Sequence, residues 1–299
     1  MAVLILGGED DDHVRHMRQY LGGRGAEAEV MDSRAFPGSL TLAYHPCPER
    51  GTLGLPSGRR LLFEEIGAVY WRSYHGVRTP QLPHPEQSFI AENDARGLFE
   101  SMLIRLPARW VNGWRAYTLH QTKPAQLAMV AALGVVVPET LVTNNPDELA
   151  GFVERHREVI FKPVQGGAHT RLVTPAHLGP ENLASLRTAP VTLQSLVAGT
   201  NVRVFVAGER VLACEIATEK LDYREDEAPS PRPHRLPEDV AADGVRIARA
   251  LDLLWTGMDF RLTPDGRYVF LEANPSPMFL GFERLGGLPL TEILGDLLV

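Results

Sequence analysis

The chain has 299 residues with 30 basic and 37 acidic side chains, and therefore a formal net charge of −7. Hydrophobic residues make up 44% and charged residues 22%, as in ordinary globular proteins. The net acidity argues against a general nucleic-acid binder, and no apolar stretch approaches the ~18 residues of a membrane span. The two cysteines give no disulfide framework, and the N-terminus lacks the basic region of a signal peptide. We therefore expect a cytoplasmic protein with neither nucleic acid nor membrane as a partner.

The length allows about two domains at roughly 100–200 residues each. The first third has the pattern of a parallel sheet, because a strand, a helix and a second strand follow one another. The expected elements are, in chain order, a strand over 3–6, a helix over 12–21, a strand over 28–31, an irregular segment over 32–60, a strand over 68–74, a helix over 89–106 and a closing segment over 110–112. The loop Gly7-Gly8 lacks the spacing of a dinucleotide fingerprint.

The remaining two thirds begin near residue 116 and combine helices with hairpins. In the middle of the chain we expect a helix over 123–133, a strand over 135–140, a helix over 146–155 and a strand over 159–161. Further on we expect one hairpin of 202–206 with 211–217, a polar mobile loop over 218–239, a helix over 238–253, a second hairpin of 257–262 with 267–273 and a last helix over 291–298. Both hairpins have turn residues between two apolar runs.

The second hairpin carries the strongest chemical signal. If its turn closes over 263–266, Asp259 lies opposite Phe270, and Glu272 is a diagonal neighbour about 7–8 Å away on the same face. Asn274 points to the same side as Glu272 because side chains alternate along a strand. Oxygen ligands of this kind suit Mg²⁺, with Mn²⁺ as the alternative ion. A solvated hairpin face is the other interpretation, although the apolar neighbours of the carboxylates argue against it.

Only three of the 30 basic side chains are lysines, namely Lys123, Lys162 and Lys220. Lys162 ends an apolar strand and precedes a glycine-rich segment, where a bound anion would offset the cost of burying its charge. Lys123 lies at a helix start, where the helix dipole disfavours a basic residue, so an anion is again indicated. A surface lysine is the alternative for Lys162, and Lys220 is expected to be solvated.

The order of these residues along the chain resembles the ATP-grasp ligases. The shared motifs are Lys123, Lys162-Pro-x-x-Gly-Gly, Gln194-Ser-Leu-Val, Asn201-Val-Arg203, Asp259 and Glu272-x-Asn274. More narrowly, the chain resembles the RimK-related branch and the peptide-cyclising ligases of the graspetide or microviridin type, through segments 69–72, 110–112, 138–144 and 269–275. The resemblance implies an α/β fold with α+β lobes, an ATP-grasp fold preceded by a pre-ATP-grasp domain. The implied domains are 1–115 (pre-ATP-grasp), 116–192 (central subdomain) and 193–299 (C-terminal subdomain).

The resemblance also implies roles for individual residues. Those expected to bind the nucleotide are Lys123 and Lys162 (phosphates), Gln165, Gly166 and Gly167 (a flap over the phosphates), Gln194, Ser195, Leu196 and Val197 (adenine) and Asn201 (ribose). Arg203 and Lys162 would be the catalytic pair, with Arg203 facing the transferred phosphoryl group. The Mg²⁺ ligands would be Asp259, Glu272 and Asn274. Ser195 departs from the pattern, since many relatives have glutamate there.

Two arginines are candidates for substrate binding. Arg72 follows an aromatic pair and would line the acceptor pocket, with plain structural packing as the alternative. Arg224 lies in a segment that matches a motif of the peptide cyclases, and it would bind a substrate carboxylate unless it is simply solvated.

The function implied by the resemblance is an ATP- and Mg²⁺-dependent ligase. Such an enzyme activates a carboxylate as an acyl phosphate, joins it to an amine or a hydroxyl, and releases ADP and phosphate. Its first expected substrate is a ribosomal peptide. The alternatives are a RimK-type ligase that adds an amino acid to a small molecule or a protein terminus, and a nucleotide-binding sensor without catalysis. Relatives of this kind are often oligomers, so a homo-oligomer is a further expectation.

Overall fold

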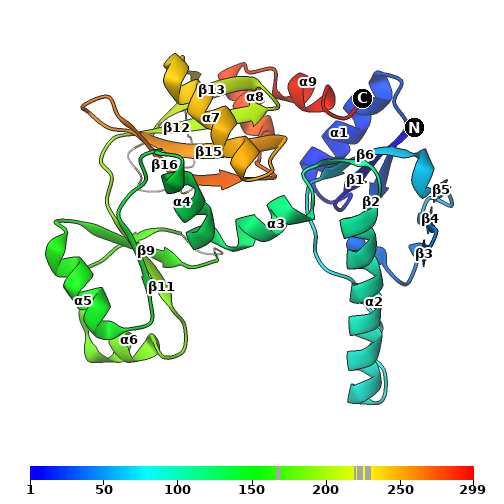
Figure 1. The fold of residues 1–299 in the computed structure, drawn as a ribbon, viewed down its shortest axis with the longest axis horizontal. Helices are drawn as coiled ribbons and strands as arrows, with labels where there is room; N and C mark the ends of the chain where they lie inside the picture. The colour runs from blue at the N-terminus through cyan, green and yellow to red at the C-terminus, as the bar shows by residue number, and fades with distance from the viewer. Residues whose placement is uncertain (166–168, 219, 221–224, 226–229) are drawn as a thin grey trace.

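A computed structural model describes residues 1–165, 169–218, 220, 225 and 230–299. In this part of the chain the strands form four sheets, and helices cover them (Figure 1). We define three lobes by these sheets. The N-terminal lobe holds the first two sheets along the chain, the central lobe holds the sheet of β8–β11, and the C-terminal lobe holds the sheet of β12–β16. The expected boundaries at 115 and 192 stay predictions, and a helix crosses the first of them.

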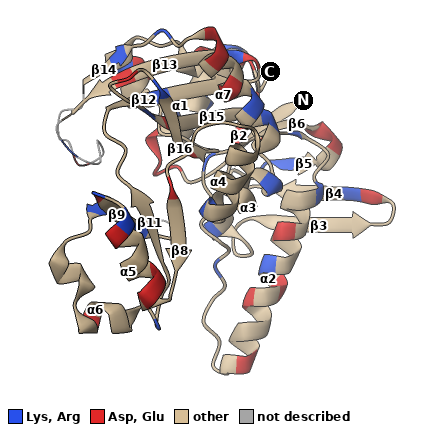
Figure 2. Cartoon of the chain, turned by 60° about the vertical axis from the view of Figure 1, so that its left-hand side comes forward, with Lys and Arg blue, Asp and Glu red and all other residues tan. Residues whose placement is uncertain are grey.

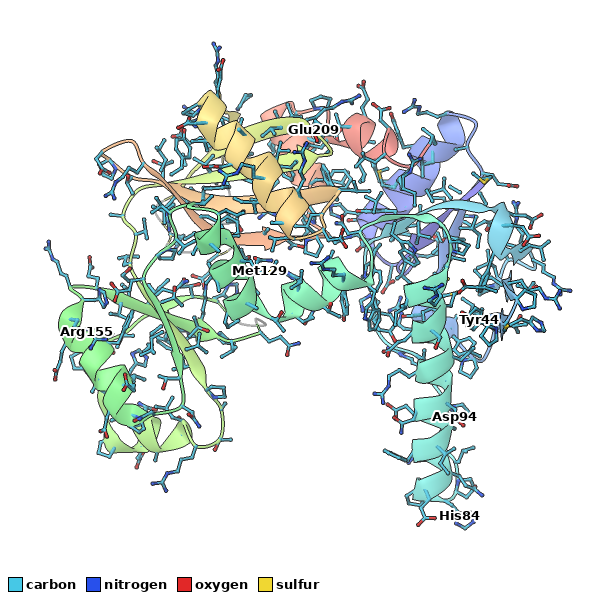
Figure 3. The ribbon with its side chains drawn as sticks, viewed as in Figure 1. Tyr44, His84, Asp94, Met129, Arg155 and Glu209 are labelled. Atoms are coloured by element: carbon cyan, nitrogen blue, oxygen red, sulfur yellow. The ribbon has the colours of Figure 1, made fainter. Side chains whose placement is uncertain are left out.

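The N-terminal lobe contains the parallel sheet that the sequence predicts, in the order β2-β1-β6-β7. Its elements are β1 (Ala2–Leu6), α1 (Asp12–Gly23), β2 (Ala28–Met31), β6 (Ile66–Trp71), α2 (Pro85–Arg105) and β7 (Arg109–Val111). Asp11 caps α1, since its side chain accepts a hydrogen bond from the backbone N–H of His13 at 2.7 Å. Helix α2 extends away from its lobe, with His84 at the far end and Asp94 along it (Figure 3).

The prediction of an irregular segment over 32–60 is wrong. Three strands form an antiparallel sheet there, namely β3 (Thr41–Pro46), β4 (Glu49–Gly54) and β5 (Arg60–Leu62). The alternation of apolar and polar residues that marks a strand is weak, because most of β3 is exposed and β4 contains two glycines. One of them, Gly51, has a structural reason: a Cβ there would lie 2.4 Å from the ring of Phe63.

The central lobe has an antiparallel sheet in the order β10-β9-β11-β8. It contains β8 (Thr140–Thr143), α5 (Pro146–Arg155), β9 (Val159–Pro163), β10 (Arg171–Leu172), α6 (Pro180–Ser185) and β11 (Val191–Ser195). Two helices precede it, α3 (Trp114–Gln121) and α4 (Lys123–Ala132), and the sequence predicts only the second. The predicted strand over 135–140 is wrong, since β8 begins at its last residue. Instead the backbone C=O of Val136 accepts a hydrogen bond from Phe270 N at 2.8 Å, so this segment lies against the C-terminal sheet.

The C-terminal lobe has a five-stranded sheet in the order β14-β13-β12-β15-β16, and both predicted hairpins are confirmed. Its elements are β12 (Thr200–Ala207), β13 (Arg210–Ala217), β14 (Ser230–Pro233), α7 (Glu238–Ala250), β15 (Trp255–Leu262), β16 (Tyr268–Asn274), α8 (Leu280–Gly286) and α9 (Leu290–Gly295). The predicted loop over 218–239 therefore includes a strand. The two prolines of this strand, Pro231 and Pro233, are tolerated because β14 is an outer strand of the sheet. Residues 219, 221–224 and 226–229 lie outside the described part.

The N-terminal and C-terminal lobes share a buried core, because Val3 and Ile5 of β1 cluster with Phe205, Trp255 and Phe279. Basic and acidic residues are interspersed along the ribbon (Figure 2). No helix among the described residues combines the length and the apolarity needed to cross a bilayer. The cytoplasmic location and the homo-oligomer stay predictions.

Asn112, directly after β7, joins these two lobes through its buried amide. Its Nδ2 donates to the backbone C=O of Trp255 at 2.6 Å and of Pro275 at 2.7 Å. Its Oδ1 accepts from the backbone N–H of Leu254 at 2.7 Å and of Trp255 at 3.2 Å. One side chain thus satisfies four main-chain groups at the start of β15 and the end of β16.

We predict that Asn112→Ala lowers the free energy of unfolding by about 3 kcal/mol, because several buried main-chain groups lose their partner. The midpoint of urea unfolding measures the change. Asn93→Ala is the matched control, since that amide makes an exposed bond within α2. An equal effect of both substitutions would contradict the role of Asn112.

Candidate active site

Two of the three lysines meet at one pocket. Lys123 is the first residue of α4, and Lys162 lies near the end of β9, opposite Thr192 of β11. Both lysines line a pocket whose wall also includes Glu272 of β16. The fold therefore brings together two basic residues that the sequence predicts to hold one anion.

The register of the second hairpin differs from the predicted one. Asp259 pairs directly with Glu272, whereas Phe260 pairs with Phe270, so a bulge leaves Leu271 without a cross-strand partner in β15. The prediction that Asp259 lies opposite Phe270 is therefore wrong. The bulge brings the two carboxylates closer than a diagonal pair, because directly opposed Cα atoms lie about 4.5–5.5 Å apart.

Each of these carboxylates has a basic partner. Arg203, opposite Asp259 on the neighbouring strand β12, donates from Nη1 to Asp259 Oδ1 at 2.7 Å. Lys123 Nζ lies 2.8 Å from Glu272 Oε2. Gly257 makes room for the guanidinium, because a Cβ there would lie 2.6 Å from Arg203 Nη2. The site thus contains two opposed acids and two cations that neutralise them.

The predicted metal ligands form a set of oxygen donors at the end of β16. Asn274 Oδ1 accepts a hydrogen bond from Ser276 N at 2.9 Å, which orients its amide. Among the described residues, no group of three or more histidine, cysteine, aspartate or glutamate side chains could hold a metal ion. Two carboxylates and one amide fit Mg²⁺, which keeps several waters and shares its remaining coordination sites with phosphates.

The predicted adenine and ribose residues lie along β11 and β12. Gln194 is buried, and its Nε2 donates to Thr140 Oγ1 at 2.9 Å, so its side chain faces β8. The backbone N–H groups of Ser195 and Leu196 donate to carbonyls of the chain itself, at 3.0 and 2.9 Å. Asn201 lines a pocket of about 530 Å³ beside β13.

The remaining predicted residues are only partly described. Gln165 donates from Nε2 to Gln121 Oε1 at 2.7 Å, which connects the segment after β9 to the end of α3. Gly166, Gly167 and Arg224 lie outside the described residues.

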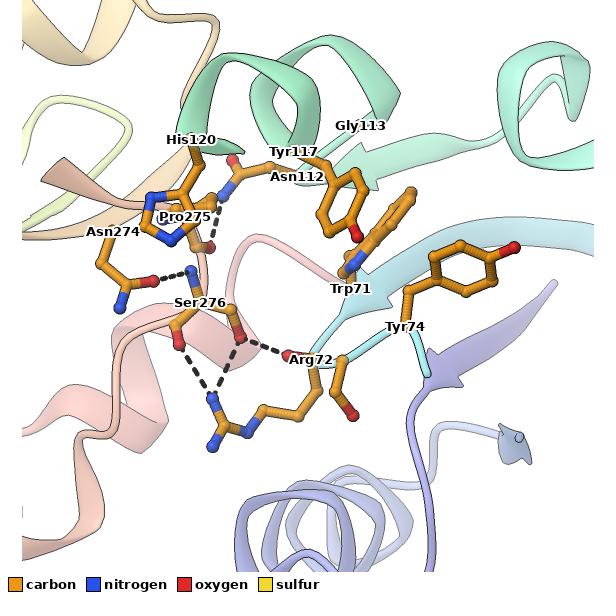
Figure 4. A pocket seen from close by; sticks show the side chains of 11 residues that line it. Trp71, Arg72, Tyr74, Asn112, Gly113, Tyr117, His120, Asn274, Pro275 and Ser276 are labelled. Carbon is orange, nitrogen blue, oxygen red and sulfur yellow. Dashed lines mark hydrogen bonds between the residues drawn. The ribbon is translucent and has the colours of Figure 1, made fainter. Parts of the chain in front are cut away.

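Arg72 connects the N-terminal lobe to the loop after β16. Its Nε lies 2.8 Å from Asp11 Oδ2, and its Nη1 donates to the C=O and Oγ of Ser276 at 2.8 and 3.1 Å (Figure 4). Burial alone would raise the pKa of Asp11, but hydrogen bonds from His13 and the charge of Arg72 hold that pKa below its usual value. Arg72 is therefore a largely buried connection as well as a pocket residue.

A pocket of about 200 Å³ lies between Arg72 and Asn274. Aromatic side chains form one wall, and His120 of α3 lies on the other side (Figure 4). Nδ1 of His120 is buried and has no hydrogen-bond partner among the described residues. Burial together with the charge of Lys123 lowers the pKa of the ring. The sequence did not single out His120 or Tyr117, because the helix over 114–121 that places them one turn apart was not among the predicted elements.

No protein-family model matches the chain. Among solved structures, that of the ATP-grasp ligase PsnB in complex with a minimal precursor has a sequence 31% identical to this chain. It covers 99% of this chain and 97% of its own, with a TM-score of 0.85. This chain belongs to the ATP-grasp ligases. It is accordingly an ATP-dependent ligase, and its predicted fold class is confirmed.

Two further relatives differ from PsnB in their sequence identity to this chain or in the part of it that they cover. The macrocyclase MdnC from Microcystis aeruginosa MRC has a TM-score of 0.87 over 100% of this chain and 99% of its own, but its identity of 23% indicates the fold alone. Glutathione synthetase from Prochlorococcus marinus (strain MIT 9313) is 29% identical over 176 residues, which span 54% of this chain and 56% of the synthetase.

The ion pairs of the site lead to a prediction for Lys123→Met. Removing the cation beside Glu272 should strengthen Mn²⁺ binding in the absence of nucleotide by a few-fold, since the carboxylate loses a competing positive charge. The same variant should bind ADP more weakly if Lys123 contacts the phosphates as the resemblance implies, because that partner is then lost. Electron paramagnetic resonance of free Mn²⁺ and calorimetry with ADP measure the two effects.

Lys220→Met, the change at the third lysine, is the matched control and should alter neither affinity. Weaker binding of both Mn²⁺ and ADP to Lys123→Met would show that the lysine supports the fold of the site and does not compete with the metal.

Proposed function

We propose that this ATP-grasp ligase uses ATP and Mg²⁺ to join a carboxylate to an amine or a hydroxyl on a ribosomal peptide. The observation that carries the proposal is the directly opposed pair Asp259 and Glu272, which lies beside Lys123 and Arg203. The likeness to PsnB supports the peptide substrate, since PsnB structures hold a minimal precursor or a variant of it, and two of them also hold Mg and ADP. ATP is a cytoplasmic metabolite, in keeping with the expected location.

The described residues divide the chemistry between them. Lys123 and Lys162 bind the phosphates from two elements, and Arg203 faces the transferred phosphoryl group. Asp259, Glu272 and Asn274 would hold Mg²⁺, which supplies positive charge next to the phosphate oxygens. Phosphoryl transfer depends on positioning and on charge neutralisation, so a site made of lysines, an arginine and carboxylates is sufficient.

The reaction has two steps. The substrate carboxylate attacks the γ-phosphorus, the bond to the β-phosphate oxygen breaks, and ADP leaves. The amine or hydroxyl then attacks the carbonyl carbon of the acyl phosphate, phosphate leaves, and the nucleophile gives up its proton. Water must be kept from the acyl phosphate between the steps.

The pocket beside Asn274 is our proposed acceptor site. It adjoins one proposed Mg²⁺ ligand, and aromatic side chains form one wall. It also contains Arg72 and His120, whose Nδ1 has no partner in the part of the chain that the structure describes. Its volume of about 200 Å³ suits one side chain of a peptide. Arg224 would contact the substrate carboxylate.

A second candidate is a RimK-type ligase that adds an amino acid to a small molecule or a protein terminus. The partial match to a glutathione synthetase favours it. The two functions differ in substrate and not in the nucleotide reaction. A short precursor peptide encoded beside this chain would favour peptide modification. Turnover with free amino acids alone would favour the second candidate.

We predict that turnover of such a precursor releases ADP and phosphate, with a loss of about 18 Da per bond formed in the peptide. Glu272→Ala and Lys162→Ala should each lower kcat by about 100-fold or more, because charge stabilisation is lost at the reacting phosphate. Coupled ADP detection and mass spectrometry of the peptide measure both quantities.

The matched control is Asp265→Ala, at the turn of the same hairpin, where the carboxylate bonds Thr263 and Arg267. It should keep full activity. Release of AMP and pyrophosphate would overturn the proposed reaction, and full turnover by either active-site variant would overturn the residue assignment.

A further inference from the structure

Gln126 is a buried amide that none of the motifs includes. It lies one helical turn after Lys123 in α4, and the residue is 3% exposed. Its Oε1 accepts a hydrogen bond from Ala273 N at 2.8 Å, and its Nε2 donates to Ala273 O at 3.0 Å. Both main-chain groups of Ala273 are therefore satisfied by one side chain.

This contact closes the outer edge of the C-terminal sheet. β16 is the last strand in the sheet order, and Ala273 pairs with Met258 on its inner side. Among the described residues, no further strand follows β16 on its outer side. Val136 O accepts a hydrogen bond from Phe270 N on this side, and at Ala273 the amide of Gln126 takes the place that a neighbouring strand would have. An open edge would leave these groups to water or to another chain.

The contact also fixes the residues around it. Ala273 lies between Glu272 and Asn274, two of the proposed Mg²⁺ ligands, so its peptide groups set where both side chains begin. Lys123, on the same helix, donates a hydrogen bond from Nζ to Glu272 Oε2 at 2.8 Å. The amide of Gln126 and the ammonium group of Lys123 therefore both connect α4 to the strand that carries the proposed ligands.

Filling the core does not require this polarity. Gln126 lies beside the apolar cluster that includes Leu127, Val130 and Ala273, where an unbranched apolar side chain would occupy similar volume. A buried amide is unfavourable unless its donors and acceptors are used, and here both are used on one backbone position.

We propose that Gln126 is a positioning residue for the magnesium–nucleotide complex, which it influences through the backbone of β16 between Glu272 and Asn274. The inference rests on the proposed function. Groups that orient metal ligands typically change metal affinity by about 10–100-fold when they are replaced. The effect should therefore appear in the Mg²⁺-dependent part of nucleotide binding.

The test is isothermal calorimetry with ADP, with and without Mg²⁺, on the full chain. Gln126→Met should weaken ADP binding in Mg²⁺ by about 10-fold or more, while binding in EDTA changes by less than about threefold. The matched control is Tyr268→Phe, on the same strand β16. It removes a hydroxyl that lies 2.7 Å from His234 Nε2. It should leave both affinities unchanged.

Gln126→Asn keeps the amide but draws it back by one methylene, so it should show the same selective loss. Variants that bind ADP like the wild type in Mg²⁺ would overturn the inference, as would equal losses with and without Mg²⁺. Unfolding of both variants would also overturn it, since the amide would then be purely structural. A wild-type chain that binds no ADP would instead refute the proposed function.

Discussion

The direct opposition of Asp259 and Glu272 is the constraint on which the rest of the site depends. Like charges directly opposite each other on neighbouring strands destabilise a sheet. Such a pair is stable in a folded chain only if positive charge lies close to both members. The surrounding elements supply it from two directions, with Arg203 on the adjacent strand and Lys123 at the start of a helix.

Neutral groups hold these charges in place. Gly257 leaves the space that the guanidinium of Arg203 occupies. Gln126 holds the backbone between Glu272 and Asn274. Asn112 holds the backbone directly after Asn274, through its hydrogen bond to Pro275 O. The amides act on main-chain atoms, so they determine where the carboxylates begin without adding charge. This division explains why a strongly charged site can sit on a strand whose other residues are largely apolar.

The sequence predicted most of what depends on local structure. Both hairpins and the helix over 146–155 follow from turn residues and from periodicity, and the structure has them where expected. The register at Asp259 was not predicted, because the bulge at Leu271 shifts the pairing by one residue and the alternation of side chains does not reveal where a bulge lies. The sheet of β3–β5 and the strand β14 escaped notice because exposed positions, glycines and prolines weaken the strand pattern.

The candidate site was predictable as a set of residues but not as a set of contacts. The motifs name Lys123, Lys162, Arg203 and the three oxygen donors, whereas the pairing of each acid with a particular cation depends on the fold. Gln126 and His120 carried no signal in the sequence, because a lone glutamine or histidine in a helix usually has no special role. Their roles become visible only in the fold, where Gln126 contacts the backbone of Ala273 and His120 lines the pocket beside Asn274.

The contacts after β16 divide the site into two parts. Asn274 bonds to Ser276, Ser276 bonds to Arg72, and Arg72 bonds to Asp11 at the start of α1. The proposed metal ligand and the proposed acceptor pocket therefore belong to one continuous block, in which the N-terminal and C-terminal lobes share a buried core. Lys162 comes instead from the central lobe, whose own buried cluster holds β9 and β11 together. The proposed acceptor pocket and the proposed metal site are thus connected by hydrogen bonds and one ion pair, while the proposed phosphate contact of Lys162 depends on how the central lobe meets that block.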